Sequence, residues 1–370
     1  MKKVKIGVLG AHRGQTMIDI IKAHPDAELV AVCDKNKQAL EKIGSGITLY
    51  ESLEDFFSHD MDAVVLANYA NEHADIAIRF LESGRHVMSE VLPTQTIAQA
   101  VRLIEAVESS KKVYAYAENY CYMTIPFEMR NRYEKGEIGE IQYAEGEYIH
   151  DCSSIWSEFT NNNDKTHWRN TMYPTYYCTH SLGPILTITG LRPVQVIGFE
   201  TNMNPASNPA ISFNGGSGGI EMVTLENGAI VKSIHGGLKR EPGSINYQIY
   251  GTKGMMESNR FDGSNMSCYI EGENLCHGEL NTYNPEPFIT TDLSKSIKGH
   301  GGSDFYTTHF FIEKILDRPL GHKYAIDVYT AVDMGICGIL AYRSIINGNI
   351  PIKVPNLRNL DERNMYRYDG

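Results

Sequence analysis

One β–α–β unit at the start of the chain constrains the fold more than any other feature. Residues 4–9 (VKIGVL) form an apolar run that ends at Gly10, and residues 28–34 (ELVAVCD) form a second run. Between them, QTMIDIIKAHP has the apolar spacing of a helix and stops at Pro25. Two strands joined by a crossover helix lie parallel in one sheet. The unit therefore predicts an α/β domain.

The same alternation of strands and helices continues to residue 120. Further buried strands are predicted at 62–68, 85–90 and 112–118, and helices at 73–84 and 96–110. The strands are apolar almost throughout, which is typical of a parallel sheet covered on both faces. We therefore expect an α/β Rossmann domain at residues 1–120.

The pattern changes beyond residue 120. Residues 141–150 alternate like a half-exposed strand. Residues 219–237 carry Asn227-Gly228 between two alternating runs, which is a strong hairpin signal, and residues 245–258 predict a second hairpin. These features are typical of an antiparallel sheet.

The second part of the chain is therefore predicted to be a separate α+β domain with an open-faced, mainly antiparallel sheet. A chain of 370 residues is long enough for two domains. We place the second domain at residues 121–345. We expect residues 346–370 to be a C-terminal tail that packs back on the body of the protein.

Composition excludes several classes of partner. The chain carries 45 acidic and 34 basic residues, a formal net charge of −11, which repels phosphate backbones and anionic membranes. We therefore expect no nucleic acid and no membrane partner, and we find no run of about 20 apolar residues that could span a bilayer. The seven cysteines form no C-x-x-C pair and the 13 histidines have no ligand spacing. This indicates reduced thiols, a cytoplasmic location and no metal site.

The glycine turn after the first strand is a candidate dinucleotide site. Gly10 and Gly14 lie where backbone N–H groups at a helix N-terminus can meet a pyrophosphate. Asp34 ends the second strand, where a carboxylate binds the ribose hydroxyls and disfavours a 2′-phosphate. These residues predict that the site binds NAD rather than NADP. We expect His12 and Arg13, in the same loop, to contact the cofactor, Arg13 through a phosphate. Because G-A-H-R-G departs from G-x-G-x-x-G, the alternative is an α/β fold that binds another ligand.

Two later segments carry side chains suited to acid–base chemistry. His180 lies at the predicted start of a helix, and an imidazole exchanges protons near neutral pH. Tyr177 precedes it by three residues, about one helical turn. Glu118 follows the last strand of the predicted Rossmann domain, at the edge where open α/β sheets bind ligands. The alternatives are a capping or packed histidine and a salt bridge at a domain hinge.

These motifs resemble the Gfo/Idh/MocA family of glucose–fructose oxidoreductases and inositol dehydrogenases across nearly the whole chain. The matching segments are VKIGVLGAHRG, ELVAVCD, DAVVLANYANEHADIAIRFLESGRHVMSE and YGTKGMMES. The resemblance implies a Rossmann domain followed by a substrate-binding open sheet, which often forms an oligomer surface, so we expect a homodimer or homotetramer. It also implies that Asn68, Tyr69 and His73 lie along the cofactor and Glu90 near the nicotinamide ribose.

One departure from the family pattern and four further segments narrow the resemblance to one branch of the family. The typical dehydrogenase of the family has a lysine after the glutamate, whereas this chain has Val91, which cannot move a proton. The segments AENYCYM, GEIQYAEGEYIHD, YYCTHSLGPILTITG and KGHGGSDF look like the NAD-dependent branch called glycoside hydrolase family 109. That branch implies a small carbohydrate substrate.

The branch resemblance also assigns roles to individual residues. It makes His180 the central catalytic group, assisted by Tyr177 and by Glu118 facing the sugar. It places Asn119 at the nicotinamide amide and implies substrate contacts from Tyr283 and His300. A mobile surface loop is the alternative reading of the segment that carries His300.

Three functions follow as hypotheses. The first is a glycosidase that oxidises C3 of the sugar, eliminates the aglycone, adds water and reduces C3 again, with no net redox change. The alternative is an NAD-dependent sugar oxidoreductase that replaces the missing lysine with His180 or Tyr177. A third, non-catalytic function is the sensing of NAD or a sugar.

Overall fold

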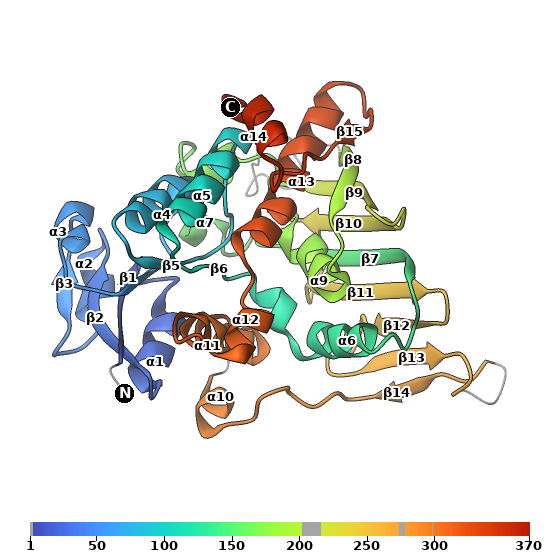
Figure 1. Cartoon of the computed structure of the whole chain (residues 1–370), viewed down its shortest axis with the longest axis horizontal. Coiled ribbons are helices and arrows are strands. Elements are labelled where there is room, and N and C mark those ends of the chain that lie inside the picture. The colour runs from blue at the N-terminus through green and yellow to red at the C-terminus, as the bar shows by residue number, and fades with distance from the viewer. Residues whose placement is uncertain (1–2, 202–215, 274–277, 298) are drawn as a thin grey trace. The chain divides into compact units, whose positions relative to one another are not determined.

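The structure is a computed structural model that describes residues 3–201, 216–273, 278–297 and 299–370. The chain divides into two compact units (Figure 1). The first unit comprises 1–122, 289–332 and 357–370, and the second comprises 123–288 and 333–356. The sequence instead predicted one continuous second domain at 121–345. The difference arises because periodicity predicts that a segment is helical but not which sheet it packs against.

The first unit contains a six-stranded parallel sheet in the order β3-β2-β1-β4-β5-β6. Its strands are β1 (Val4–Leu9), β2 (Ala27–Cys33), β3 (Thr48–Tyr50), β4 (Ala63–Leu66), β5 (His86–Ser89) and β6 (Tyr114–Tyr116). The order reverses between β1 and β4, and open α/β sheets bind dinucleotides at such a switch point. The prediction of an α/β Rossmann domain is confirmed.

The helices of the first unit come from both ends of the chain. Between the strands lie α1 (Gln15–Ala23), α2 (Lys37–Glu41), α3 (Leu53–Phe57), α4 (His73–Glu82) and α5 (Ile97–Ser110). Later segments add α10 (Asp292–Ser296), α11 (Ser303–Ile315), α12 (Pro319–Tyr324) and α14 (Leu360–Tyr366). In that late group, α11 packs on α1, and α14 packs on α5. A bidentate pair between Arg363 and Glu108, with both N···O distances 2.6 Å, joins α14 to α5.

The second unit contains a nine-stranded sheet in the order β14-β13-β12-β11-β7-β10-β9-β8-β15. Its strands are β7 (Ile141–Ile149), β8 (Pro193–Glu200), β9 (Gly218–Leu225), β10 (Ile230–Gly236), β11 (Ser244–Gly251), β12 (Gly254–Ser258), β13 (Met266–Ile270), β14 (Asn281–Tyr283) and β15 (Ile352–Lys353). Among the described strands of this second sheet, only β7 and β10 pair in parallel. The predicted α+β fold with a mainly antiparallel sheet is confirmed.

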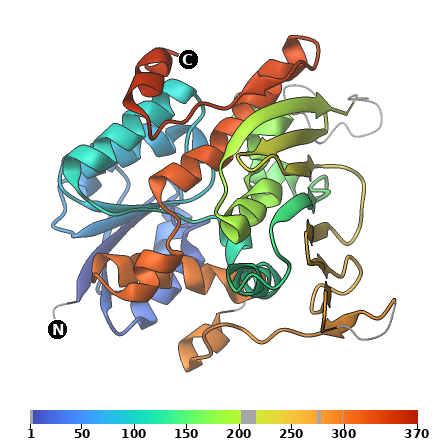
Figure 2. The same ribbon diagram turned by 45° about the vertical axis from the view of Figure 1, so that its right-hand side comes forward.

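Helices α6 (Thr124–Glu134), α7 (Trp156–Phe159), α8 (Trp168–Thr171) and α9 (Thr179–Thr189) complete the second unit together with most of α13 (Val328–Ile346). Helix α9 packs on one face of the sheet at β7 and β10 (Figure 2). A Cβ atom on Gly146 of β7 would lie 1.9 Å from the carbonyl oxygen of Ser181, so only glycine permits this approach. The bare backbone of β7 therefore sets the position of the first turn of α9.

One stretch meets the length and hydropathy of a membrane span, contrary to the expectation from the sequence. It is Pro319–Ile346, which contains α12 and α13, and 83% of its most apolar window is buried inside the protein. Such burial is typical of a core helix.

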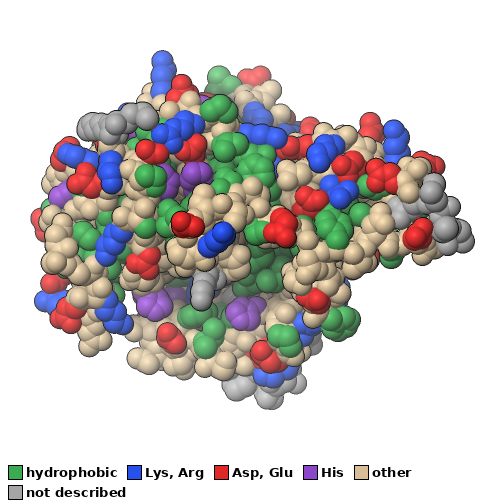
Figure 3. All heavy atoms as spheres, turned by 90° about the horizontal axis from the view of Figure 1, so that it is seen from below, with side chains coloured by type: hydrophobic (Ala, Val, Ile, Leu, Met, Phe, Trp, Pro, Cys, Tyr) green, Lys and Arg blue, Asp and Glu red, His purple; other side chains and the backbone are tan. Residues whose placement is uncertain are grey.

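On the face shown in Figure 3, cationic and anionic side chains are interspersed, so a phosphate backbone would meet carboxylates as well as cations there.

Candidate functional site

The glycine turn lies at the carboxyl end of β1, beside the switch point of the sheet. Gly10 has a φ of 97°, and a Cβ atom on it would lie 2.4 Å from the carbonyl oxygen of Ala67. A Cβ atom on Gly14 would lie 2.3 Å from the carbonyl oxygen of Gly10. No side chain caps the N-terminus of α1, and its first turn carries no acidic residue. Since helix N-terminal N–H groups bind anions, this turn fits a pyrophosphate.

Asp34 lies just beyond the end of β2 and touches the glycine turn directly. Its Oδ2 accepts a hydrogen bond from the backbone N–H of Ala11 at 2.6 Å, and its Oδ1 accepts one from Asn36 at 2.8 Å. Each carboxylate oxygen has a second lone pair, so both bonds leave acceptors for ribose hydroxyls. His12 is exposed at the same turn.

The segment after β4 holds three residues that were predicted to lie along the cofactor. The side-chain oxygen of Asn68 is buried without a hydrogen-bond partner among the described residues, while its amide nitrogen donates to Glu72 at 2.9 Å. Tyr69 is 49% exposed. His73 is fully buried between the carbonyl oxygens of Leu92 and Asn68, at 3.0 and 3.2 Å. Burial lowers the pKa of His73. The imidazole thus supports the loop, and its contact with a cofactor stays a prediction.

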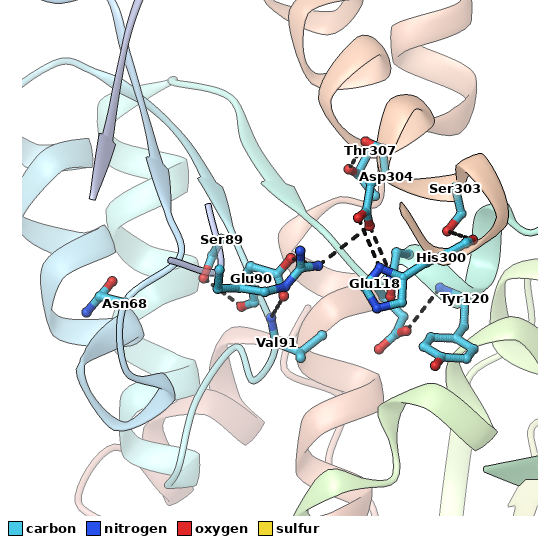
Figure 4. A network of polar contacts seen from close by, with 12 residues as sticks. Asn68, Ser89, Glu90, Val91, Glu118, Tyr120, His300, Ser303, Asp304 and Thr307 are labelled. Carbon is cyan, nitrogen blue, oxygen red and sulfur yellow. Dashed lines mark hydrogen bonds and ion pairs between the residues drawn. The ribbon is translucent and has the colours of Figure 1, made fainter. Parts of the chain in front are cut away.

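A polar network centred on Asp304 connects four segments of the first unit (Figure 4). Arg13 pairs with Glu90 at 2.6 Å and lies 3.5 Å from Oδ1 of Asp304. The same Oδ1 accepts a hydrogen bond from Asn119 at 3.1 Å, and Oδ2 lies 3.0 Å from Nδ1 of His300. Arg13, predicted to contact a phosphate, therefore faces two carboxylates.

Asp304 is completely buried, yet its environment favours the charged form. Burial works to raise the pKa of its carboxyl, but the hydrogen bond with His300 and the charge of Arg13 outweigh burial and lower that pKa. The sequence analysis did not single out Asp304. No local pattern marks it, because Asp304 and Arg13 meet only through the packing of α11 against α1.

Glu118 lies just beyond β6 and is fully buried. Its Oε1 accepts a hydrogen bond from the backbone N–H of Tyr120 at 3.3 Å. The ring of Tyr120 in turn lies 6.4 Å from that of His300, centroid to centroid. Glu118, Asn119 and His300 are therefore brought to the carboxyl edge of the parallel sheet, although the sequence analysis placed His300 in the second domain.

In the second unit, His180 lies in the first turn of α9 within an aromatic cluster. The ring of Tyr148 stands edge-on to its imidazole at a centroid distance of 4.8 Å, and that of Tyr177 at 5.0 Å. Tyr247 donates a hydrogen bond to the backbone carbonyl of His180 at 2.6 Å, and Arg169 lies 5.7 Å from the centre of the Tyr177 ring. His180 and Tyr177 therefore lie side by side, and their catalytic roles stay predictions.

Tyr148 and Arg169 are residues of this cluster that the sequence analysis missed. Tyr148 belongs to β7, and the alternation of that strand could have assigned it to the same face as Gly146, against α9. Arg169 lies in the short helix α8, which carries no periodic signal. The hydroxyl of Tyr283 accepts a hydrogen bond from Arg132 at 2.6 Å and donates one to Glu128 at 2.8 Å, and the contact of Tyr283 with substrate stays a prediction. Burial and the carboxylate of Glu128 raise the pKa of Tyr283.

Two features of the first unit fit a dinucleotide. One is the glycine turn, where a Cβ atom would not fit, and the other is the buried side-chain oxygen of Asn68, which has no hydrogen-bond partner among the described residues. Gly10, Gly14 and Asp34 would hold its pyrophosphate and adenosine ribose. Within the described ranges, no group of three or more His, Cys, Asp or Glu side chains is arranged to hold a metal ion.

Comparisons with known proteins match two successive parts of the chain to two family models. Residues 4–118 match the model of the oxidoreductase family with the NAD-binding Rossmann fold named GFO_IDH_MocA, and residues 195–360 match the glycosyl hydrolase 109 C-terminal domain. Glycosyl hydrolase family 109 protein 1 of Phocaeicola vulgatus is 26% identical, over 95% of this chain and 83% of the relative. The family 109 protein of Porphyromonas gingivalis is 25% identical, over 100% of this chain and 88% of the relative.

A solved structure of levoglucosan dehydrogenase with NADH and levoglucosan superposes with a TM-score of 0.76. The alignment covers 96% of this chain and 100% of that one, at 16% identity. This likeness is one of fold.

Proposed function

The chain belongs to the Gfo/Idh/MocA proteins by its NAD-binding Rossmann domain and to glycosyl hydrolase family 109 by its C-terminal domain, and from this we propose that it is an NAD-dependent, redox-assisted glycoside hydrolase. The observation that carries the proposal is His180, an imidazole flanked by two tyrosine rings at the start of α9. Val91 replaces the lysine of ordinary dehydrogenases, so proton transfer has to come from elsewhere in the chain.

The reaction needs proton transfer at two positions of the sugar. NAD held by the first unit would accept the C3 hydride while a base takes the proton of the C3 hydroxyl, and hydride and proton would both return at the end of the cycle. The C3 ketone acidifies the proton at C2, and His180 removes that proton as the aglycone leaves. Tyr148 and Tyr177 offer aromatic faces to sugar C–H groups and hydroxyls to sugar oxygens. Water then adds across the double bond, and the C2 proton is restored.

The test uses a panel of nitrophenyl glycosides of both anomers, with and without added NAD, in D2O. The proposal predicts aglycone release without accumulated NADH, and deuterium at C2 of the product sugar. Net NADH without aglycone would instead establish a sugar oxidoreductase. Binding of NAD or sugar with neither product would establish a sensor and refute both enzymatic functions.

Three further expectations accompany this proposal. A homodimer or homotetramer and a cytoplasmic location stay predictions, and the oligomer is measured by light scattering of the full chain. NAD rather than NADP is proposed because Asp34 would repel a 2′-phosphate.

A further inference from the structure

The first turn of α9 lies on one row of residues that crosses four adjacent strands of the second sheet. Gly146 of β7 pairs with Tyr247 of β11 on one side and with Ser233 of β10 on the other. Ser233 in turn pairs with Glu221 of β9. Paired residues of adjacent strands point to the same face of a sheet. Because Gly146 lies against the carbonyl oxygen of Ser181 in α9, the whole row faces that turn.

Two hydrogen bonds fix α9 at the place where His180 lies. The hydroxyl of Tyr247 donates to the backbone carbonyl of His180 at 2.6 Å, so β11 holds the peptide group that joins His180 to Ser181. On the other side of the row, the hydroxyl of Ser181 lies 2.8 Å from that of Ser233. Both serine side chains are fully buried. The residue after the proposed catalytic histidine is therefore tied to β10 by its side chain.

A buried carboxylate anchors this connection. Ser233 donates its hydroxyl to Oε2 of Glu221 at 2.7 Å, and Nε2 of His235 donates to Oε1 at 2.9 Å. Glu221 is 0% exposed and His235 is 1% exposed. A carboxylate only accepts hydrogen bonds, so the single hydroxyl hydrogen of Ser233 points to Glu221, and Ser181 donates to Ser233. These side chains thus form a continuous chain of hydrogen bonds from α9 to β9.

The same turn sets the distance between His180 and its aromatic neighbours. The ring of Tyr148 lies 4.8 Å from the imidazole and that of Tyr177 lies 5.0 Å from it, centroid to centroid. A buried polar group that loses its partner is costly to leave unsatisfied, so the structure around it shifts. A misplacement of about 1 Å can lower a catalysed rate by about 100-fold. If the network only stabilised the sheet, its loss would leave His180 in place.

We propose that Glu221 and Ser233 are positioning residues for His180 and that they act through the hydroxyl of Ser181. All four residues belong to the second unit. The inference rests on the proposed hydrolase function, in which His180 removes the proton from C2 of the sugar. Since the network reaches His180 through the backbone of α9, its loss should lower kcat and leave the affinity for NAD nearly unchanged.

The first test measures the position of His180 without turnover. The full chain is labelled with 13C and 15N at histidine and examined by NMR, and His180→Gln identifies the His180 signals by their loss. The shifts of the imidazole protons depend on the ring currents of the two neighbouring tyrosines, which fall off steeply with distance. We expect Ser181→Ala and Ser233→Ala each to move these signals. Unmoved His180 signals in both variants would overturn the inference.

Thr187→Val is the matched control for the serine variants. It removes a hydroxyl of the same helix, which donates to the carbonyl oxygen of Pro184 at 3.0 Å, and it should leave the His180 signals in place. Ser181→Ala keeps the buried pair of Glu221 and His235, so it decides the question if Ser233→Ala does not fold.

The second test measures turnover. We expect Ser181→Ala and Ser233→Ala each to lower kcat by about tenfold or more, with NAD affinity within about threefold of the wild type. Because both changes remove the same connection, the double variant should lose about as much as the more affected single variant. Losses that multiply in the double variant would refute an action of Ser233 through Ser181.

Glu221→Gln is the conservative variant of the anchor. Its amide oxygen still accepts from His235 and its NH2 group donates to Ser233. Ser233 then donates to Ser181, and Ser181 to the carbonyl oxygen of Cys178, which lies 3.0 Å away. We expect Glu221→Gln to keep kcat within about threefold of the wild type, and Glu221→Leu to lose about tenfold or more. Equal losses in both variants would refute the hydrogen-bonded connection.

Failure of this inference is distinguishable from failure of the proposed function. Wild-type kcat in both serine variants would refute the inference, while aglycone release by the wild type upheld the function. No aglycone from the wild type would refute the function, and the NMR signals would still decide whether the network holds His180 in place.

Discussion

Acidification should weaken the first unit at the pair His24–His309. His24 follows α1 and is 3% exposed, and its Nε2 lies 3.0 Å from Nδ1 of His309 on α11. The backbone N–H of Asp26 donates to Nδ1 of His24 at 3.2 Å. Nδ1 of His24 is therefore an acceptor, and Nε2 donates to His309. A second proton on His24 would abolish the bond from Asp26.

Burial lowers the pKa of His24 from 6.5 to about 4, and the neighbouring His309 and the charge of Arg318 act in the same direction. The negative charges of Asp26 and Glu313 act to raise this pKa, but burial outweighs them. Between these two values the unfolded chain binds a proton that the folded chain does not bind. The contribution of neutral His24 to the free energy of unfolding is therefore fully present above pH 6.5, and it is lost as the pH falls through this window. At about 1.4 kcal/mol per pKa unit, the loss is roughly 2–3 kcal/mol by about pH 4.5.

His24→Gln removes the titrating group and keeps an amide donor. The free energy of unfolding is measured by urea denaturation at several pH values from about 7.5 to 4.5. Over this range it should fall by roughly 2–3 kcal/mol more for the wild type than for this variant. His322→Gln, which removes an exposed histidine of the same unit, should follow the wild type. Parallel pH profiles for the wild type and His24→Gln would refute the reasoning.

Three further changes test the candidate site. Asp34→Ser should raise the affinity for NADP relative to NAD by about tenfold or more, because the like charge facing a 2′-phosphate is gone, and fluorescence titration with both cofactors measures this. Gly10→Ala should destabilise the first unit by roughly 1–3 kcal/mol and prevent NAD binding, because its Cβ would strike the carbonyl of Ala67; unaltered thermal unfolding would contradict this. His180→Ala should cost about 100-fold or more in turnover with NAD affinity nearly unchanged, whereas equal loss of both would make His180 structural.

Local patterns predicted much of the fold because they report burial. The strand at 4–9 coincides with β1, and Asn227-Gly228 indeed connects β9 to β10, which pair antiparallel. The strand β3 (Thr48–Tyr50) was missed because it is only three residues long and none of its side chains is buried. Where solvent covers a strand, neither apolar runs nor alternation mark it.

The candidate site was predictable only where its residues are close in the chain. The glycine turn and Asp34 lie within one β–α–β unit, whose geometry is known from the motif. Asp304 and Arg13 belong to opposite ends of the chain and meet through helix packing that no periodicity encodes. The family resemblance drew attention to His300 but not to Asp304, whose carboxylate lies 3.0 Å from Nδ1 of His300.

The interleaving of the two units has a consequence for synthesis on the ribosome. The chain leaves the first unit after Tyr122, returns at Ile289, leaves again after Val332 and returns at Leu357. Arg363 and Arg367, within the last eight residues, pair with Glu108 and Glu105 of α5. The six strands of the Rossmann sheet are all made by residue 116, but the first unit stays incomplete until residues 289–332 and 357–370 have been synthesised. Any fragment that stops at residue 120 therefore lacks the helices α10, α11, α12 and α14 of that unit.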